Sequence, residues 1–476
     1  MTNSTNEENK TLTIAIAGAS GFVGKHLISR LLKNPKIKII ALSRSAFENT
    51  DRITWIPCDL FSLLQIEKAL KGADVAAYLV HSMIPSASLS QGHFWDFDFI
   101  LADNFARAAE KNGLKHICYL GGLLPPSTTE LSRHLSSRKE VEDIFLSYDV
   151  PITTLRAGLV IGEGGSSFRI LEKLVKRLPV MLCPKWARTQ MQPIDIDDIV
   201  RSLEHTLLQP IDRNQRFDVG TMEATSYEFM LKLAAKILQR PTLFFSFPLF
   251  SPGLSRLWIR LITGAPKDLV YPLVESLKHQ MTVEEEFRLH LPGPPLLTLE
   301  ESLRKAFDKE PLKDQKVIKP KSKMMRGPSQ KAESSKVVRS VQRFTLPQGW
   351  SIQKVAEAYM SWLDHTFSFF LVVLREKDFA HFTLFGKIKM LSLKFSEDRT
   401  FSDRVLFYVV GGLLVKPSEV HRARFELRKS RDNRYVIAAI HDYSPRLPWF
   451  IYKYTQAIAH LIVMKAFGAW LKKQKI

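Results

Sequence analysis

The sequence predicts an α/β protein whose first part is a doubly wound parallel sheet and whose last part is a smaller α+β domain. Three observations support this prediction. Short continuous apolar runs alternate with amphipathic stretches up to about residue 177, a basic stretch then interrupts the chain near residues 311–340, and an alternating strand pattern follows it. Apolar strands separated by helices are typical of a parallel sheet covered on both faces. A chain of 476 residues is also too long for one core.

Each element of the first domain follows from its own pattern. Short apolar runs bounded by turn residues indicate strands, and an apolar residue every three or four positions indicates a helix. The expected strands are Leu12–Ala17, Ile37–Leu42, Ile53–Pro57, Val75–Val80, His116–Leu120 and Ile152–Leu155. The expected helices are Lys25–Leu32, Leu63–Leu70, Phe99–Lys111, Arg138–Leu146 and Ser167–Arg177. Alternation fades over residues 217–307, where the expected helices are Tyr227–Leu238 and Leu254–Ile262.

A basic stretch, residues 311–340, follows the first domain at residues 11–310. It holds nine Lys or Arg residues against two acids, Asp314 and Glu333, and few large apolar residues. This composition predicts a disordered or extended linker. A solvated tether is the first interpretation of its charge, and weak contact with an anionic membrane surface is the alternative.

The remaining residues, 341–476, predict an α+β domain. The apolar positions near 355–363 have helical spacing. His421–Arg428 alternates as a half-buried strand would, and Tyr435–Ile440 returns as its partner after a polar turn. Trp449–Leu471 then predicts a long terminal helix, which is too interrupted by lysines to span a bilayer. Helix, antiparallel strands and a final helix resemble START-like ligand-binding folds.

The strongest motif is the glycine spacing directly after the first strand. Gly18 permits a tight turn, Gly21 lets backbone amides approach a pyrophosphate, and Gly24 lets the following helix pack closely on the strand. The helix N-terminus then favours the phosphates. The motif predicts a dinucleotide-binding Rossmann site whose cofactor-binding residues are Gly18, Ala19, Ser20, Gly21, Phe22, Val23 and Gly24.

The end of the second expected strand indicates which dinucleotide binds. NAD-selective sites place an acid here for the ribose 2′-hydroxyl, whereas this chain has Ser43 and Arg44. An arginine can pair with a 2′-phosphate and stack on adenine. NADP(H) is therefore the expected cofactor, with NAD(H) as the alternative. Asp59 and Leu60, after the third strand, are expected beside the adenine, and His81, after the fourth, near the nicotinamide.

These residues resemble the extended or atypical branch of the short-chain dehydrogenase/reductase superfamily, which includes NmrA-like regulators, nucleotide-sugar epimerases and an accessory subunit of respiratory complex I. The resemblance covers residues 11–310. It is carried by the glycine spacing, the Asp-Leu pair and the segment Gln192-Pro-Ile-Asp-Ile-Asp-Asp-Ile-Val200. Tyr119-Leu-Gly-Gly-Leu123, His134-Leu-Ser-Ser-Arg138 and Leu155–Gly162 are similar to bacterial members with an extra C-terminal domain. The resemblance implies that the segments near residues 217–307 form a small cap over the cofactor crevice.

The sequence departs from this superfamily at its catalytic pair, YxxxK, in which tyrosine transfers the proton and lysine holds the nicotinamide ribose. Lys139 matches the lysine, but Leu135 stands where the tyrosine belongs. Gly121 and Gly122 replace the usual serine. The candidate catalytic residues are therefore Lys139 and His81, with Tyr78 as a further candidate proton donor. Without the tyrosine, we expect little oxidation of ordinary secondary alcohols, whereas reduction of conjugated alkenes or quinones needs less proton assistance.

The sequence thus predicts a cytoplasmic NADP(H)-binding oxidoreductase of unknown substrate, peripheral to a membrane if the basic linker binds lipid. A non-catalytic NADP(H)-sensing regulator or assembly factor is the alternative, and lipid handling by the last domain is a third hypothesis. No metal-ligand spacing exists among the three cysteines, and no apolar leader occurs among the first residues. Nucleic acid, an anionic membrane surface and anionic cofactors are all candidate explanations of the net charge of +20, and the charge alone does not choose among them. No nucleic acid is expected as a partner. Substrate and oligomeric state are left open.

Overall fold

The computed structural model describes residues 11–82, 89–125, 130–247, 252–308, 337–416 and 423–474. The chain divides into two compact units. One comprises residues 1–83 and 98–322, and the other residues 84–97 and 323–476. The domain boundaries expected from the sequence stay predictions, but the sequence had not suggested that a segment near residue 90 belongs with the C-terminal residues.

A parallel sheet forms the centre of the first unit, as expected, but it has seven strands, and the edge strand β12 was not among the six expected. Its spatial order is β12-β7-β6-β4-β1-β2-β3. The strands are β1 (Leu12–Ala17), β2 (Ile37–Ser43), β3 (Ile53–Pro57), β4 (Val75–Tyr78), β6 (His116–Gly122), β7 (Ile152–Ala157) and β12 (Gln215–Val219). The order reverses between β1 and β4, because the chain fills one side of β1 before it crosses to the other. In open parallel sheets, ligands bind in the crevice at the carboxyl ends of strands beside such a reversal.

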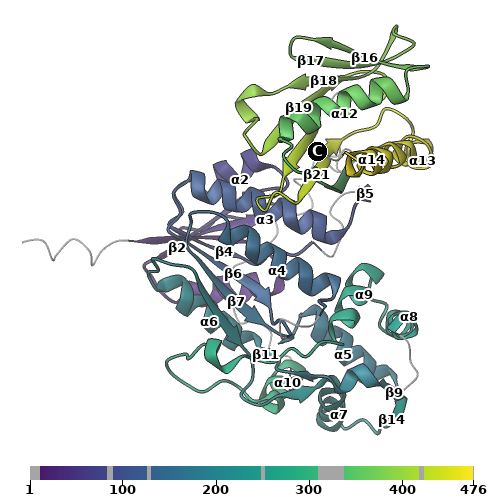
Figure 1. Ribbon diagram of the computed structural model, residues 1–476. Coiled ribbons are helices and arrows are strands. Elements are labelled where there is room, and N and C mark those ends of the chain that lie inside the picture. The colour runs from purple at the N-terminus through teal and green to yellow at the C-terminus, as the bar shows by residue number, and fades with distance from the viewer. Residues whose placement is uncertain are drawn as a thin grey trace, which may run out of the picture. The chain divides into compact units, whose positions relative to one another are not determined.

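Helices cover both faces of this sheet (Figure 1). They are α1 (Phe22–Leu31), α2 (Leu63–Ala69), α3 (Phe94–Lys111), α4 (Arg133–Leu146) and α6 (Ile196–Leu208). Leu27 of α1 and Leu203 of α6 pack in one core cluster with Ile14 of β1. On the other face, the ring of Tyr78 packs against Phe105 of α3 and Phe145 of α4. The sheet is therefore buried on both sides, which explains its continuous apolar strands.

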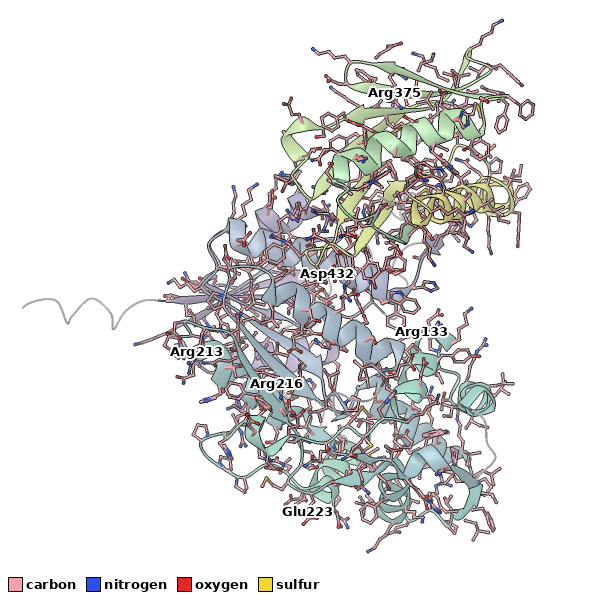
Figure 2. All side chains as sticks on the ribbon, viewed as in Figure 1. Arg133, Arg213, Arg216, Glu223, Arg375 and Asp432 are labelled. Atoms are coloured by element: carbon pink, nitrogen blue, oxygen red, sulfur yellow. The ribbon has the colours of Figure 1, made fainter. Side chains whose placement is uncertain are left out.

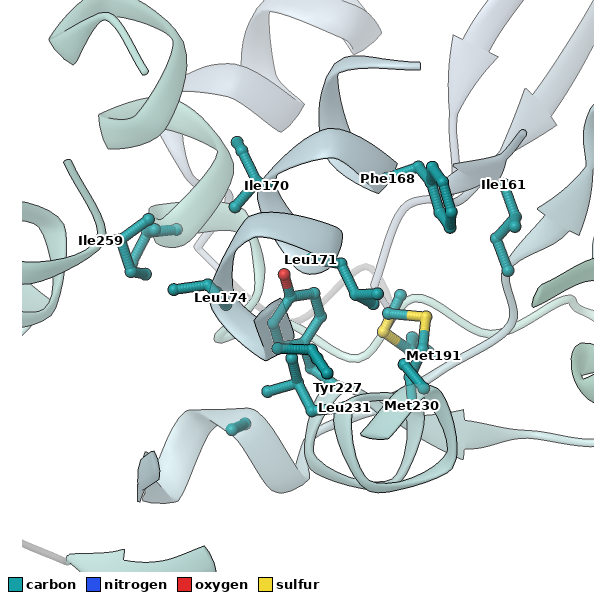
Figure 3. Close-up of a cluster of buried hydrophobic side chains, with 14 of the residues drawn as sticks. Ile161, Phe168, Ile170, Leu171, Leu174, Met191, Tyr227, Met230, Leu231 and Ile259 are labelled. Atoms are coloured by element: carbon teal, nitrogen blue, oxygen red, sulfur yellow. The ribbon is translucent and has the colours of Figure 1, made fainter. Parts of the chain in front are cut away.

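The rest of the first unit packs around a second apolar cluster (Figure 3). This cluster joins Phe168 and Leu171 of α5 to Met230 and Leu231 of α7. The elements of this region are β8 (Val160–Ile161), α5 (Ser166–Arg177), β9 (Val180–Pro184), β10 (Gln190–Met191), β11 (Ile194–Asp195), β13 (Thr225–Ser226), α7 (Tyr227–Ile237), β14 (Leu243–Phe247), α8 (Pro252–Thr263), α9 (Lys267–Ser276) and α10 (Leu299–Phe307). The expectation that residues 217–307 form a cap over the cofactor crevice stays a prediction, and α5 and β9, from earlier in the chain, pack in the same region.

The second unit is an eight-stranded mixed sheet with helices, which agrees with the expected α+β class. Its order is β16-β17-β18-β19-β20-β21-β15-β5. The strands are β5 (Leu89–Gln91), β15 (Val338–Thr345), β16 (Leu371–Glu376), β17 (Phe379–Leu384), β18 (Ile388–Phe395), β19 (Arg404–Gly411), β20 (Arg424–Lys429) and β21 (Tyr435–Tyr443). Helices α12 (Ile352–Thr366) and α14 (Gln456–Lys472) pack with one sheet face in a core cluster, and α13 (Trp449–Tyr454) precedes α14. The resemblance to START-like folds stays a prediction.

Several expected elements differ in detail. Helix α4 begins at Arg133 rather than Arg138, because Ser132 caps it by accepting a hydrogen bond from the Leu135 amide. The terminal helix is interrupted at Thr455, whose backbone is not helical. Strand β20 is buried on both faces rather than half-buried, since Glu426 forms ion pairs with Arg404 and Arg428. The predicted linker lies outside the described residues up to position 336, and its last residues begin β15.

Candidate functional site

The glycine turn lies at the carboxyl end of β1, where the order of the sheet reverses. Gly18 has a φ of +87°, a left-handed conformation that suits glycine. A Cβ added to Gly24 would lie 2.3 Å from the Gly18 carbonyl oxygen, so only glycine allows α1 to approach this turn. A Cβ on Gly18 would lie 3.1 Å from the carbonyl oxygen of Leu79. The turn is therefore packed against the end of β4, two residues before His81.

The first turn of α1 fits the phosphates of a dinucleotide. Gly21 is the N-cap residue, and no side chain within the described residues caps the helix there. The first amides of a helix have no partner within the helix, and they carry a partial positive charge. A glycine N-cap keeps the approach to these amides free of a side chain. Ala19, Ser20, Gly21, Phe22 and Val23 thus form the turn and helix start that would hold the pyrophosphate.

The end of β2 lies beside this turn. The Ser43 hydroxyl donates to the Ser20 hydroxyl over 3.1 Å, and the Ser45 amide donates to Ser43 Oγ over 3.2 Å. The Arg44 side chain is exposed. The end of β2 therefore carries serine hydroxyls and the guanidinium of Arg44. The segment Ser43-Arg44-Ser45 contains no acid. This donor set fits the phosphate of a 2′-phosphorylated ribose.

The turn after β3 is held in place by α3. The buried Asn104 side chain donates to the Leu60 carbonyl over 3.0 Å. Asp59 Oδ1 accepts from the Phe61 amide over 3.1 Å, and the Cys58 amide donates to the Ser43 carbonyl over 2.8 Å. The ends of β2 and β3 are thus tied together, and the expected roles of Asp59 and Leu60 beside an adenine stay predictions.

His81 follows β4 and contacts a buried carboxylate. Its Nδ1 atom lies 3.2 Å from Asp98 Oδ2 of α3, while the Ser82 amide donates to Asp98 Oδ1 over 2.8 Å. Because an ionised carboxylate can only accept, the imidazole Nδ1 carries the proton in this contact. The Nε2 atom of neutral His81 is then a proton acceptor.

Two groups of α4 complete the contacts of Asp98. Arg138 Nη2 donates over 2.6 Å and the Ser137 hydroxyl over 2.9 Å, both to Oδ2. Burial raises the pKa of Asp98, but Arg138 and His81 outweigh burial and hold that pKa well below its usual range. Asp98 is therefore a permanent carboxylate. Arg138 neutralises it, so this arginine positions the loop after β4 and the start of α4.

A second histidine, His134, lies beside the first. The two imidazole centroids are 5.1 Å apart. His134 Nδ1 lies 3.0 Å from the hydroxyl oxygen of Ser276, and that hydroxyl donates its proton to the Pro272 carbonyl. When the single proton of Ser276 points to the Pro272 carbonyl, His134 Nδ1 is the donor in this contact. The Nε2 atom of neutral His134 is therefore also a proton acceptor.

Both histidines are neutral near pH 7. Burial lowers the pKa of His134 well below its ordinary value, and the neighbouring His81 and Arg138 lower it further. Burial also lowers the pKa of His81, followed by the charge of Arg138. The ends of β4 and α4 thus bring together two imidazoles that are neutral at physiological pH, which is a suitable state for general bases.

The other candidate residues from the sequence do not take part in these contacts. Lys139 is exposed on α4 and forms an ion pair with Asp143 over 2.8 Å, and its role with the ribose stays a prediction. Leu135 is buried in the cap cluster. Tyr78 is 1% exposed, and burial raises its pKa, so its hydroxyl is poorly suited to donate a proton to a substrate.

A second pair with the same spacing begins one position earlier on α4. His134 and Arg138 have the same separation of four residues as the tyrosine and lysine of the superfamily. His134 was not identified from the sequence, because Lys139 was aligned with the lysine of the YxxxK pattern. Helix α4 was also expected to begin only at residue 138. A histidine four residues before an arginine was the available signal. Figure 2 labels Arg133, the first residue of α4.

Comparison with known proteins finds a family match that lies mostly within the first unit. Residues 14–220 match the NAD dependent epimerase/dehydratase family. The auxiliary protein GraX of Staphylococcus aureus is 34% identical over 112 residues, which are 23% of this chain and 36% of that protein. The match thus spans about a third of the length of this curated relative. Within the described residues, no group of acidic, histidine or cysteine side chains could hold a metal ion.

Three solved structures have a similar fold to part of the chain. They are an NADPH complex of a quinone oxidoreductase of Escherichia coli (19% identity, 62% of this chain and 99% of that chain, TM-score 0.49), a nucleoside-diphosphate-sugar epimerase of Staphylococcus aureus (16%, 62% and 100%, TM-score 0.49) and an NADP(H) complex of a Citrobacter triphenylmethane reductase (15%, 62% and 99%, TM-score 0.48).

The resemblance seen in the sequence is confirmed, and so is the expectation of a nicotinamide dinucleotide as the cofactor class. The parallel sheet, the glycine turn at its reversal point and the family match agree with one another. Among the described residues, none of the helices is both long and apolar enough to cross a bilayer. Over residues 14–220, this chain is similar to the NAD dependent epimerase/dehydratase family, which agrees with the resemblance to extended short-chain dehydrogenases/reductases.

Proposed function

We propose that this protein is an NADP(H)-dependent oxidoreductase in which His134 carries the proton that tyrosine carries in the standard members of its superfamily. The observation that supports this most directly is the pair of neutral imidazoles, His81 and His134, with centroids 5.1 Å apart. They follow β4 and begin α4, and the glycine turn packs against Leu79, close to His81 in the chain. The substrate class is a secondary alcohol and its ketone. This departs from the expectation of little alcohol oxidation, because His134 replaces the missing tyrosine in this proposal.

The proton chemistry follows from the state of His134. Bound NADP⁺ supplies a hydride acceptor. As the substrate carbon loses its hydride, the substrate hydroxyl loses its proton to the Nε2 atom of His134, and a carbonyl remains. Carbonyl reduction reverses both transfers, with imidazolium as the acid. Ser276 keeps Nδ1 of His134 in the donor state, so Nε2 keeps its lone pair for this step.

His81, Asp98 and Arg138 support this group. The carboxylate of Asp98 stabilises positive charge on His81, whose ring neighbours His134. Arg138 holds the carboxylate in place but carries a charge that disfavours protonation of both rings. This balance keeps the histidines in the basic form, which favours alcohol oxidation over carbonyl reduction at neutral pH. Arg138 and Asp98 are positioning residues in this proposal.

The preference for NADP(H) over NAD(H) also belongs to this proposal. Ser20, Ser43 and Ser45 gather at the end of β2, and the exposed Arg44 extends from the same place. Nothing acidic in this strand end would compete with a 2′-phosphate for these donors. The arginine pairs with the phosphate, and the hydroxyls complete its coordination.

Absorbance of NADPH tests this function directly. The purified protein is supplied with NADP⁺ and a panel of secondary alcohols, and with NADPH and ketones, conjugated alkenes and quinones. We expect turnover in the alcohol and ketone arms, loss of turnover in His134→Ala with nucleotide binding retained, and normal turnover in His290→Ala, an exposed histidine. Turnover that survives His134→Ala but is lost in Lys139→Ala would instead support Lys139 as the catalytic residue, as the sequence predicts.

The alternative function is NADP(H) sensing without catalysis. It is favoured by the similarity to a protein named as auxiliary rather than as an enzyme. Tight nucleotide binding with no turnover across every arm of the panel would support this alternative and exclude the oxidoreductase proposal.

A further inference from the structure

The outer face of the terminal helix α14 is apolar. Its buried side, which includes Met464, Phe467 and Leu471, packs in the core of the second unit. On the opposite side, Ile458 is 45% and Ile462 is 61% exposed. Ala459, Ala466 and Ala469 complete that exposed side.

The exposed apolar positions continue into the preceding helix. Phe450 and Tyr454 of α13 are each 68% exposed, and the non-helical Thr455 separates them from Ile458 and Ile462 of α14. We call these four side chains the apolar stripe. Together they expose more large apolar surface than an isolated surface residue, which would need no explanation.

Helix α12 of the same unit shows what an ordinary surface helix looks like. It also packs one side in the core, through Val355 and Leu363. Its exposed positions, however, are Gln353, Lys354, Glu357, Ser361, His365 and Thr366, all of which are polar. A helix at a water surface normally has this pattern. The apolar stripe therefore needs a partner other than water.

The charge around the stripe identifies that partner. Lysines 453, 465, 472 and 473 lie in or next to α13 and α14 and are exposed, and no Asp or Glu occurs after residue 442. This arrangement would repel a second copy of the same surface. Apolar and aromatic side chains with lysines beside them are instead suited to the boundary between lipid headgroups and acyl chains.

We propose that the apolar stripe lies on the surface of an anionic lipid bilayer. Ile458 and Ile462 enter the acyl boundary, the rings of Phe450 and Tyr454 lie at headgroup level, and the lysines contact lipid phosphates. Neither α13 nor α14 crosses the bilayer, which agrees with the lack of a membrane-spanning helix among the described residues. The expected contact is peripheral, reversible and sensitive to salt.

Vesicle flotation with the full chain tests the proposal. The vesicles contain phosphatidylcholine alone or phosphatidylcholine with phosphatidylglycerol. We expect binding only to the anionic vesicles, and a drop of roughly tenfold or more in apparent affinity for Ile458→Asn/Ile462→Asn. Leu261→Asn, at an exposed leucine of α8, is the matched control and should bind as the wild type does. Salt should weaken binding as the Debye length falls from about 10 Å to about 3 Å.

A fluorescent label reports the contact without relying on loss of binding. The native cysteines Cys58, Cys118 and Cys183 are all buried, so Ile462→Cys provides an accessible thiol for an environment-sensitive dye. Anionic vesicles should shift its emission to the blue, and a label at Leu261→Cys should not respond. Circular dichroism and NADPH titration of each variant verify that the protein remains folded.

Two results would overturn the proposal. One is vesicle binding that the double asparagine variant keeps in full, because the contact would then lie on another surface. The other is a wild-type protein that ignores anionic vesicles but becomes a smaller species by sedimentation velocity when Ile458 and Ile462 are replaced. In that case the stripe is covered by a second copy of the chain or another protein.

Discussion

Arg138 Nη2 lies 2.6 Å from Asp98 Oδ2, and both side chains are almost completely buried. This contact joins α3 to α4 below the two histidines. The pair of Lys139 and Asp143 lies on the same helix, has a similar length of 2.8 Å and is exposed to solvent. The two ion pairs therefore allow a direct comparison of buried and exposed charge in one helix.

Asp98→Asn should destabilise the protein by about 3–5 kcal/mol, because it leaves the buried Arg138 without its counter-charge. Asp143→Asn should cost about 1 kcal/mol or less, because exposed ion pairs contribute little. Urea unfolding of both variants measures the difference in the free energy of unfolding. Equal losses in the two variants would show that the buried pair is not needed for stability.

The rate of alcohol oxidation should depend on pH through His134. Burial lowers its pKa, so the basic form persists above and somewhat below its ordinary value of 6.5. We expect kcat/KM to be constant from about pH 7 upward and to fall only on acidification below about pH 6.5. A profile that rises steeply above about pH 8 would point to a group with a higher pKa, and so contradict the assignment.

Arg44→Ala should lower the affinity for NADPH about tenfold or more, because one charge-assisted phosphate contact contributes about 1.5–3 kcal/mol. The affinity for NADH, which has no 2′-phosphate, should change little. Calorimetric titration of both nucleotides into both proteins measures the effect. If the wild type binds the two nucleotides equally, the preference for NADP(H) is wrong.

Gly21→Val should abolish nucleotide binding. Its Cβ would lie 3.0 Å from the Gly18 carbonyl oxygen, and its methyl groups would cover the amides at the start of α1. Gly411→Val is a suitable control, since an added Cβ there meets no atom within 4 Å. Circular dichroism should show both variants folded. NADPH binding retained by Gly21→Val would place the nucleotide away from this turn.

His116 should make the protein less stable in mild acid. It is 2% exposed, and burial lowers its pKa to about 4. Below its ordinary pKa of 6.5, the unfolded chain binds a proton that the folded protein does not. Its contribution to stability is therefore complete above about pH 6.5 and declines toward pH 4, by about 2 kcal/mol at about pH 5.

Urea unfolding at about pH 6.5 and about pH 5 measures this loss. The free energy of unfolding should fall less between these pH values in His116→Gln than in the wild type. The variant keeps a group that can bond to Thr153, which lies 2.9 Å from His116 Nε2. If the free energy of unfolding depends on pH in the variant as it does in the wild type, other buried histidines cause the acid sensitivity.

The first sheet could be predicted from the sequence because its strands are short, continuous and apolar. The ends of β1 and β3 agree with the sequence prediction to the residue. The glycine turn was equally predictable, since its spacing depends only on local geometry at Gly18 and Gly24. These features are determined by neighbouring residues in the chain.

The contacts of the catalytic candidates were harder to predict from the sequence, because their neighbours come from distant segments of the chain. Asp98 lies in an aromatic-rich stretch, and its contacts with His81 and Arg138 join residues 17 and 40 positions away. The start of α4 is polar, so its helical register was not visible from apolar spacing, and His134 was missed with it. Thr455 interrupts the terminal helix within a sequence that predicts continuous helix.

Strand β5 has a consequence for how the protein can be made. Leu89–Gln91 pairs in parallel with the start of β15, and Gln91 also bonds to the Ala457 carbonyl. During synthesis, this segment leaves the ribosome long before its partners exist and must wait for them unpaired. A fragment that starts at Val337 would lack the strand and expose the edge of β15, so we expect it to aggregate when expressed alone. Adding residues 89–97 as a separate peptide should restore its solubility.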